Sequence, residues 1–518
     1  MRWLTLFLIA LAASSPARAA WREASSDHFL IYSEQNEAQL KEFASRLERF
    51  DAAMRLVRGL PNEPMGAANR VTVYVVDSVA EVQKLHGPGS SRGDFRIAGL
   101  YIPRATGSLA FTPRWAGSDG KFDTDAQIVL LHEYAHDFML RNYPGAFPAW
   151  FIEGFAEFHS TARFEKDGSV GIGAPALHRA HSLINGQRVP VETWMGRSVD
   201  ELPAAQREAL YARGWLLTHY LTFEPSRRGQ LSTFVRSLNE GKPALDAARL
   251  AFGDLKQLDK DLDKYLARPR MNYLKLDAAN VKIGPIAIRT LSPGEAAVMD
   301  VRMRSKRGVD RKAALQLLPE ARRAAAPHAN SAMAQATLAE AEYDAGNYKE
   351  AEAAADRAVA ADPKLIDGLI YKAMARMALV EEDKAAGPAQ WAQVRKLIAA
   401  ANRLDPDDPE PLMLFYRSFS AEGREPTSNA TTGLLTALQL APHDRGLRMM
   451  VAYQMLRDGR PKEARNALIP IAFDPHGGSM GKAAAAILAK LDAGDVKGAL
   501  QGAVAPPADA APGGQEER

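Results

Sequence analysis

Two histidines, His132 and His136, carry the clearest chemical signal in the sequence, within "LLHEYAHDF". Residues four apart lie on one face of a helix, so both imidazoles can point at one metal ion. Glu133 is three residues before His136, flanks the same site and is placed to act as a general base. An exposed polar helix face is the alternative, but the surrounding residues are mostly apolar, and buried histidine and glutamate need partners. A metal would supply them.

A second acidic pair, Glu153 and Glu157, follows in "PAWFIEGFAEF". The segment "RNYPG" breaks the first helix, and Pro148 suits the first turn of the next. Two helices joined by a short link can lie antiparallel, which would return Glu153 to the histidines as the third protein ligand that catalytic zinc usually has. Glu157 is then placed to hold a ligand histidine by a hydrogen bond. A solvated acidic face is the alternative, which the interleaved aromatic residues disfavour.

The motif "HEYAH" followed by "WFIEGFAEF" resembles the gluzincin metallopeptidases, and bacterial families of peptidase MA type in particular. The resemblance covers about residues 20–266, although only the two helices carry specific motifs. It implies a zincin-like fold, Zn²⁺ as the cofactor, and Glu153 as the third zinc ligand beside His132 and His136. The spacing from His136 to Glu153 is shorter than in aminopeptidase-N-like members, which implies a shorter link between the helices.

A weaker parallel lies in "YARGWLLTHYL", where Tyr211 precedes Gly214. Aminopeptidase-N-like enzymes carry a Tyr shortly before a Gly, and its hydroxyl stabilises the oxyanion. Tyr211 is therefore either such a residue or a core aromatic of an ordinary helix. The exopeptidase motif of those enzymes is absent from "IAGLYI", so N-terminal exopeptidase activity does not carry over.

The resemblance implies a hydrolytic mechanism with defined roles. Zinc would lower the pKa of a bound water to about 7. Glu133 would take the proton of that water and pass it to the leaving amine. Zinc, with Tyr211, would stabilise the oxyanion. An extended peptide substrate could pair with an edge strand of the preceding hairpin.

The elements that must position these residues suggest an α+β domain. Strands are expected at 27–33 and 70–76, with a hairpin around "PRATG". Helices are expected at 36–58, 204–222, 230–238 and 255–266 from the spacing of apolar residues. We predict the peptidase-like domain over residues 20–268, and a connector with little structure of its own over 269–307.

From residue 308 the sequence becomes alanine-rich and helical in pattern. Prolines at 363, 406, 442 and 475 are spaced 43, 36 and 33 apart and close similar segments. Such a period is typical of paired-helix repeats, and Gly346, Tyr348 and Ala351 resemble the tetratricopeptide pattern. We predict an all-α tetratricopeptide-like solenoid over residues 308–492, with a helical bundle as the alternative. Residues 493–518 look disordered.

Composition narrows the function further. The 518 residues include 65 Lys and Arg against 62 Asp and Glu, a net charge of +3 that gives no reason to expect a nucleic acid partner. There is no cysteine, which excludes disulfides, thiol nucleophiles and Cys-ligated zinc. Residues 1–19 read as a cleavable signal peptide, which predicts a periplasmic or secreted protein without stable membrane insertion.

Two functions fit these observations. The first is an exported zinc metallopeptidase that cleaves peptides or proteins and uses its helical repeats to bind substrate or a protein partner. The second is a non-catalytic, repeat-based interaction protein with a metal-binding peptidase-like domain. The presence of every expected ligand and of the base favours the first, since a degraded enzyme would commonly lose one.

Overall fold

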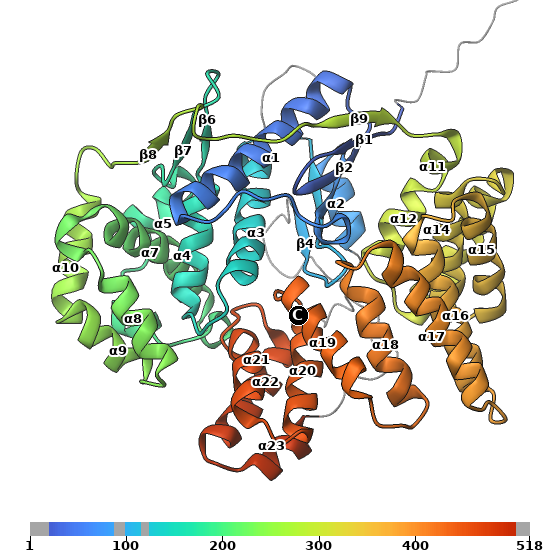
Figure 1. Cartoon of the computed structure of the whole chain (residues 1–518). Helices are drawn as coiled ribbons and strands as arrows, with labels where there is room; N and C mark the ends of the chain where they lie inside the picture. The colour runs from blue at the N-terminus through green and yellow to red at the C-terminus, as the bar shows by residue number, and fades with distance from the viewer. Residues whose placement is uncertain (1–19, 87–98, 115–123, 504–518) are drawn as a thin grey trace, which may run out of the picture.

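The computed structural model describes residues 20–86, 99–114 and 124–503 (Figure 1). The predicted signal peptide, residues 1–19, lies outside the described residues. A six-stranded mixed sheet in the order β4-β5-β3-β2-β1-β9 forms the N-terminal part. Its strands are β1 (Arg22–Ser25), β2 (Phe29–Ser33), β3 (Val71–Val76), β4 (Leu100–Ile102), β5 (Leu109–Pro113) and β9 (Ala287–Thr290). The predicted α+β domain is therefore present in outline, with the hairpin formed by β4 and β5.

The first helix shows how local sequence sets these elements. Helix α1 (Glu37–Arg58) begins at Asn36, whose side chain accepts a hydrogen bond from the backbone N–H of Gln39. It ends at Gly59, which has the left-handed conformation that glycine adopts without strain. The helix buries an apolar face in the main core of the N-terminal part. The helix predicted at 36–58 is confirmed.

Helices make up most of the rest of the N-terminal part. They are α2 (Val79–His86), α3 (Thr124–Asn142), α4 (Ala149–Ser160), α5 (Ala180–Asn185), α6 (Val191–Trp194), α7 (Ala204–Phe223), α8 (Gln230–Asn239), α9 (Ala244–Phe252) and α10 (Leu255–Leu266). A smaller antiparallel sheet joins β6 (Arg163–Phe164), β7 (Val170–Ile172) and β8 (Leu274–Leu276) in that order. The three helices predicted after residue 200 are all observed.

Residues 269–307 contain more structure than the connector predicted there, for which little structure of its own was expected. Strand β8 pairs with β7, and β9 pairs with β1 at the edge of the main sheet. Two helices follow, α11 (Pro293–Ala297) and α12 (Met299–Lys306). The N-terminal fold therefore extends past 268, to about residue 290. Strands of three or four residues carry no periodic signal, and their pairing partners lie far away in the sequence.

The remaining helices stack as antiparallel neighbours, which we call the helical array (Figure 1). They are α13 (Arg311–Ala325), α14 (Ala332–Asp344), α15 (Tyr348–Ala361), α16 (Ile366–Glu382), α17 (Pro388–Leu404), α18 (Pro409–Ala421), α19 (Ser428–Leu440), α20 (Arg445–Arg457), α21 (Pro461–Ala472), α22 (Gly478–Asp492) and α23 (Val496–Gly502). The four periodic prolines lie just after α15, α17, α19 and α21, so each one closes a helix pair as predicted. Helix α23 extends into the tail that was expected to be disordered; residues 504–518 lie outside the described residues.

The helical array does not extend freely away from the sheet. Figure 1 shows its last helices, in red, beneath α3 and α4. Ala146, at the α3–α4 link, packs with Ile469 and Leu488 of the array. The backbone N–H of Ala105 donates to the Asp444 carboxylate at 2.8 Å. The two parts of the chain therefore share an interface that reaches the predicted metal helices.

Across the described residues, none of the helices combines the length and apolarity that a membrane span requires.

Candidate metal centre

Helix α3 is held by one face against the sheet and α1. The Tyr134 ring packs at a tilt against that of Phe29, with ring centroids 5.0 Å apart, and its hydroxyl donates to Asp51 at 2.6 Å. Leu131 and Ala135 are fully buried. These contacts fix the rotation of the helix. His132 and His136 accordingly point toward α4, where Glu153 Oε2 lies 3.4 Å from each of their Nε2 atoms.

Helix α4 is buried along its whole length, including Glu153 and Glu157. A Cβ added at Gly154 would lie 2.4 Å from the carbonyl oxygen of Gly214 and 2.5 Å from Thr218 Oγ1. Glycine is thus required where α4 crosses α7, because only its missing side chain allows this approach. The close crossing fixes the axis of α4 and with it the neighbouring Glu153.

His132, His136 and Glu153 converge, and we call these three residues the His–His–Glu cluster. The two Nε2 atoms are 3.0 Å apart, and each lies 3.4 Å from Glu153 Oε2. Tetrahedral zinc with ligand bonds near 2.0–2.1 Å holds its ligand atoms roughly 3.3 Å from one another. The three residues predicted as ligands are therefore brought together at the separations that such an ion requires.

The hydrogen bonding of the cluster is incomplete. Glu153 is fully buried, yet neither of its oxygens has a hydrogen bond of good geometry among the described residues. The Nδ1 atom of His136 is also buried without a hydrogen-bond partner there. The charged contacts of the Glu153 carboxylate among the described residues are all with imidazoles, whose charge depends on a proton, so the donor set fits a bound cation.

Charge within the cluster shifts its protonation. Burial raises the pKa of Glu153, but the neighbouring His476 and His136 outweigh it and hold that pKa well below its usual value. Burial lowers the pKa of His136, whereas the Glu153 carboxylate outweighs it and raises that pKa to about 9. Glu153 therefore stays anionic, and an anionic carboxylate is a suitable ligand for a metal cation.

Glu157 lies one turn after Glu153 and joins three cationic or ionisable groups. It accepts from His178 at 2.7 Å and from Arg179 at 2.6 Å, and His132 Nδ1 lies 3.5 Å away. Burial raises the pKa of Glu157, but His178 and Arg179 outweigh it and lower that pKa to about 2. The predicted contact with a ligand histidine is therefore present at a length beyond an ordinary hydrogen bond, and Glu157 is shared with two residues that the sequence did not single out.

Tyr211 lies beside the cluster, and Glu133 directly follows His132 on α3. The Tyr211 ring lies 6.4 Å from the His132 ring, and the Arg179 guanidinium sits over it at 5.2 Å. Burial and the charges of Glu153 and Glu133 raise the pKa of the Tyr211 hydroxyl well above its usual value. The hydroxyl therefore stays protonated and able to donate. Tyr211 also packs against the main hydrophobic core, so both alternatives for this residue remain open.

One residue at the site comes from the helical array. His476, between α21 and α22, places its Nε2 atom 2.8 Å from Glu153 Oε1. Sequence reasoning missed it because more than 300 residues separate it from Glu153 and no motif marks it. His178 and Arg179 belong to no recognisable motif, and their only signal in the sequence is their adjacency in "LHRAH".

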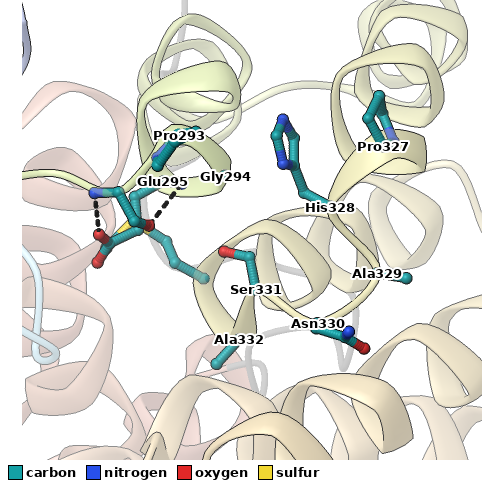
Figure 2. Close-up of a pocket in the computed structure, with 11 residues that line it drawn as sticks. Pro293, Gly294, Glu295, Pro327, His328, Ala329, Asn330, Ser331 and Ala332 are labelled. Atoms are coloured by element: carbon teal, nitrogen blue, oxygen red, sulfur yellow. Dashed lines mark hydrogen bonds between the residues drawn. The ribbon is translucent and has the colours of Figure 1, made fainter.

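A separate groove opens at the start of the helical array, with a volume of about 600 Å³. It is lined by residues 292–295 and 327–333, including His328 and Glu295 (Figure 2). None of these residues belongs to the His–His–Glu cluster. The groove is therefore not part of the candidate metal centre.

Comparison with known proteins adds little to this picture. No protein-family model matches the chain, and no curated protein matches it. Among solved structures, a thermophilic TPR protein from Thermus thermophilus is similar at 21% identity and a TM-score of 0.30, covering 33% of this chain and 88% of that one. The description of the helix pairs and of the His–His–Glu cluster therefore rests on the structure of this chain and not on similarity to other proteins.

Proposed function

We propose that the protein is a zinc-dependent metallopeptidase that hydrolyses peptide bonds. The observation that carries this proposal is the convergence of two imidazole nitrogens and one buried carboxylate oxygen within 3.0–3.4 Å of one another. Borderline-soft zinc is well served by two histidines and one carboxylate, and three protein ligands leave a position open for catalysis.

A bound zinc ion would supply Lewis acidity, lowering the pKa of water to about 7 and polarising the substrate carbonyl. Glu133, half-buried beside the ligands, accepts the proton of the attacking water and delivers it to the leaving amine. The negative charge of Glu133 raises the pKa of both His136 and Tyr211, which supports a place near both residues.

Tyr211 donates a hydrogen bond to the developing oxyanion. Its raised pKa keeps the proton on the hydroxyl throughout the neutral range. Glu157, His178 and Arg179 hold the neighbouring wall of the site through short polar contacts. Such support fixes ligand orientation and tunes metal affinity.

Peptide bonds are proposed as the substrate by resemblance to the gluzincins. Strand β4 ends the order of the main sheet among the described strands, and an extended peptide could add to it. We also propose that the protein is exported by its N-terminal signal and that the helical array holds substrate or a protein partner.

Glu133→Gln tests the proposal directly. The variant should bind zinc one-to-one as the parent does, while kcat on a mixed peptide pool falls about 10²–10⁴-fold. Metal content by atomic emission and cut sites by mass spectrometry provide the two measurements. Glu165→Gln, at an exposed position, is the matched control and should leave both unchanged.

Two results would reject the peptidase. A purified parent protein that takes up no stoichiometric zinc removes the metal centre. A Glu133→Gln variant that cleaves as fast as the parent removes the mechanism. A parent that binds zinc and cleaves nothing in the pool favours the interaction protein with a metal-binding domain.

A further inference from the structure

The loop between α21 and α22 reaches into the candidate metal centre. Its His476 Nε2 atom lies 2.8 Å from Glu153 Oε1, and its ring is nearly perpendicular to that of His136, with centroids 5.4 Å apart. Glu153 therefore faces the two histidines of α3 with one oxygen and His476 with the other. The carboxylate is approached from both of its sides, by two distant parts of the chain.

Hydrogen bonds within the loop and an ion pair to α20 fix the position of His476. The backbone N–H of His476 donates to Asp474 Oδ1 at 2.9 Å, and that of Gly477 donates to the Asp474 carbonyl at 3.0 Å. Arg445 of α20 forms an ion pair with Asp474 at 2.5 Å. Asp474 thus holds the turn through both its side chain and its carbonyl oxygen, so His476 is presented by an ordered scaffold.

Independent contacts fix the same part of the array to the β4–β5 hairpin and to the α3–α4 link. His443, which precedes α20, binds the carbonyl oxygen of Arg104 at 2.8 Å. Ile469 and Leu488, on either side of the loop, pack on Ala146. These anchors flank the loop, so its approach to Glu153 follows from the docking of the whole C-terminal end of the array.

The geometry separates His476 from the three ligands. The ligand atoms of the His–His–Glu cluster lie 3.0–3.4 Å from one another and include Glu153 Oε2. His476 instead meets the Glu153 oxygen that is turned away from the histidines. A carboxylate ligand held through its second oxygen loses freedom to rotate, and such support typically changes metal affinity about 10–100-fold.

We propose that His476 is a positioning residue that holds the Glu153 carboxylate in its ligand orientation, so that the helical array completes the metal centre. This inference rests on the proposed zinc site. The array is then a structural part of the centre and does more than bind partners.

Metal affinity of the full-length protein tests this inference without reference to hydrolysis. Zinc affinity is measured by competition with a chromophoric chelator for the parent, His476→Ala, His476→Gln and His328→Ala. We expect His476→Ala to bind one zinc about 10–100-fold more weakly. His476→Gln offers an amide N–H at similar reach and should recover most of that loss. His328→Ala makes the same substitution in the distant groove (Figure 2) and should match the parent.

Cobalt spectra of the same proteins distinguish positioning from ligation. If His476 only orients Glu153, the visible spectrum of the Co²⁺-loaded His476→Ala variant should keep the band positions of the parent. A changed coordination spectrum together with no recovery in His476→Gln would make His476 a ligand and overturn the proposal. Unchanged zinc affinity in a folded His476→Ala variant would also overturn it.

Failure of the proposal for His476 can be distinguished from failure of the proposed peptidase activity. A parent that binds zinc but cleaves no peptide favours the non-catalytic interaction protein, and the role of His476 is then still decided by the zinc affinities. A parent that binds no zinc overturns both proposals.

Discussion

Two clusters of buried ionisable side chains in this protein differ in where their compensating charge comes from. In the helical array and the segment before it, Lys306 lies 3.3 Å from the carboxylate of Glu340 and 3.8 Å from that of Asp367, which Arg302 also meets at 3.3 Å. Each carboxylate of this cluster has a permanent cation from the chain. We call it the lysine cluster.

The His–His–Glu cluster has no Lys or Arg contact of this kind to its Glu153 among the described residues. It is surrounded by imidazoles, whose positive charge depends on a proton. Imidazoles facing one carboxylate at 3.4 Å provide a preformed set of metal donors once those protons leave. In the lysine cluster, the buried carboxylates are neutralised by the chain itself, which stabilises the fold. In the His–His–Glu cluster, the buried carboxylate has no permanent cation from the chain and suits a divalent metal ion.

The largest effect should follow from removing the anion of the His–His–Glu cluster. Glu153→Gln is isosteric but offers a neutral and weaker ligand, so zinc affinity should fall about 1,000-fold, or about 4 kcal/mol. Chelator competition at fixed pH measures the change. Glu165→Gln controls for the loss of a carboxylate elsewhere; zinc binding of Glu153→Gln equal to that of the parent would contradict the assignment.

A smaller effect is expected in the lysine cluster, and it concerns the stability of the fold and not zinc affinity. Lys306→Met keeps most of the side-chain length but leaves Glu340, whose side chain is 6% exposed, without its cation. Breaking a buried ion pair this way typically costs about 3–5 kcal/mol, and partial exposure of Lys306 places the expected loss in the free energy of unfolding near 3 kcal/mol.

Denaturant unfolding measures this loss, with the exposed Lys312→Met as the matched control. Zinc stoichiometry should not change in either variant. A Lys306→Met protein that is as stable as the parent but loses its metal would contradict the assignment of the lysine cluster to fold stability and of the His–His–Glu cluster to metal binding.

The smallest effect concerns pH. Burial and the charge of Asp408 raise the pKa of Glu410 to about 8. Its folded pKa exceeds its unfolded value, so the folded state binds more protons and stability falls as pH rises from about 4.5 to 8.

Glu410→Gln removes this dependence. Because the side chain is only half-buried, we expect a gain of about 1–2 kcal/mol at pH 8 and little change at pH 5. Thermal unfolding across that pH range measures it. An equal gain at both pH values would mean that the effect does not come from titration of Glu410.

The sequence by itself determined the features of this protein that depend on residues close together along the chain. Spacing of four placed His132 and His136 on one face, and the Pro and Gly after α3 allowed the return that brings Glu153 back, because these relations act over a few turns of helix. Periodic prolines and small residues likewise marked the helix pairs of the array, since each pair packs mainly on its neighbours.

Only the tertiary structure decided which distant residues join the site and where the N-terminal fold ends. His476 meets Glu153 because the array curves back to α3, and β9 completes the main sheet from more than 250 residues beyond β1. Long-range contacts of this kind depend on the summed packing of many elements, and no short sequence pattern records that sum.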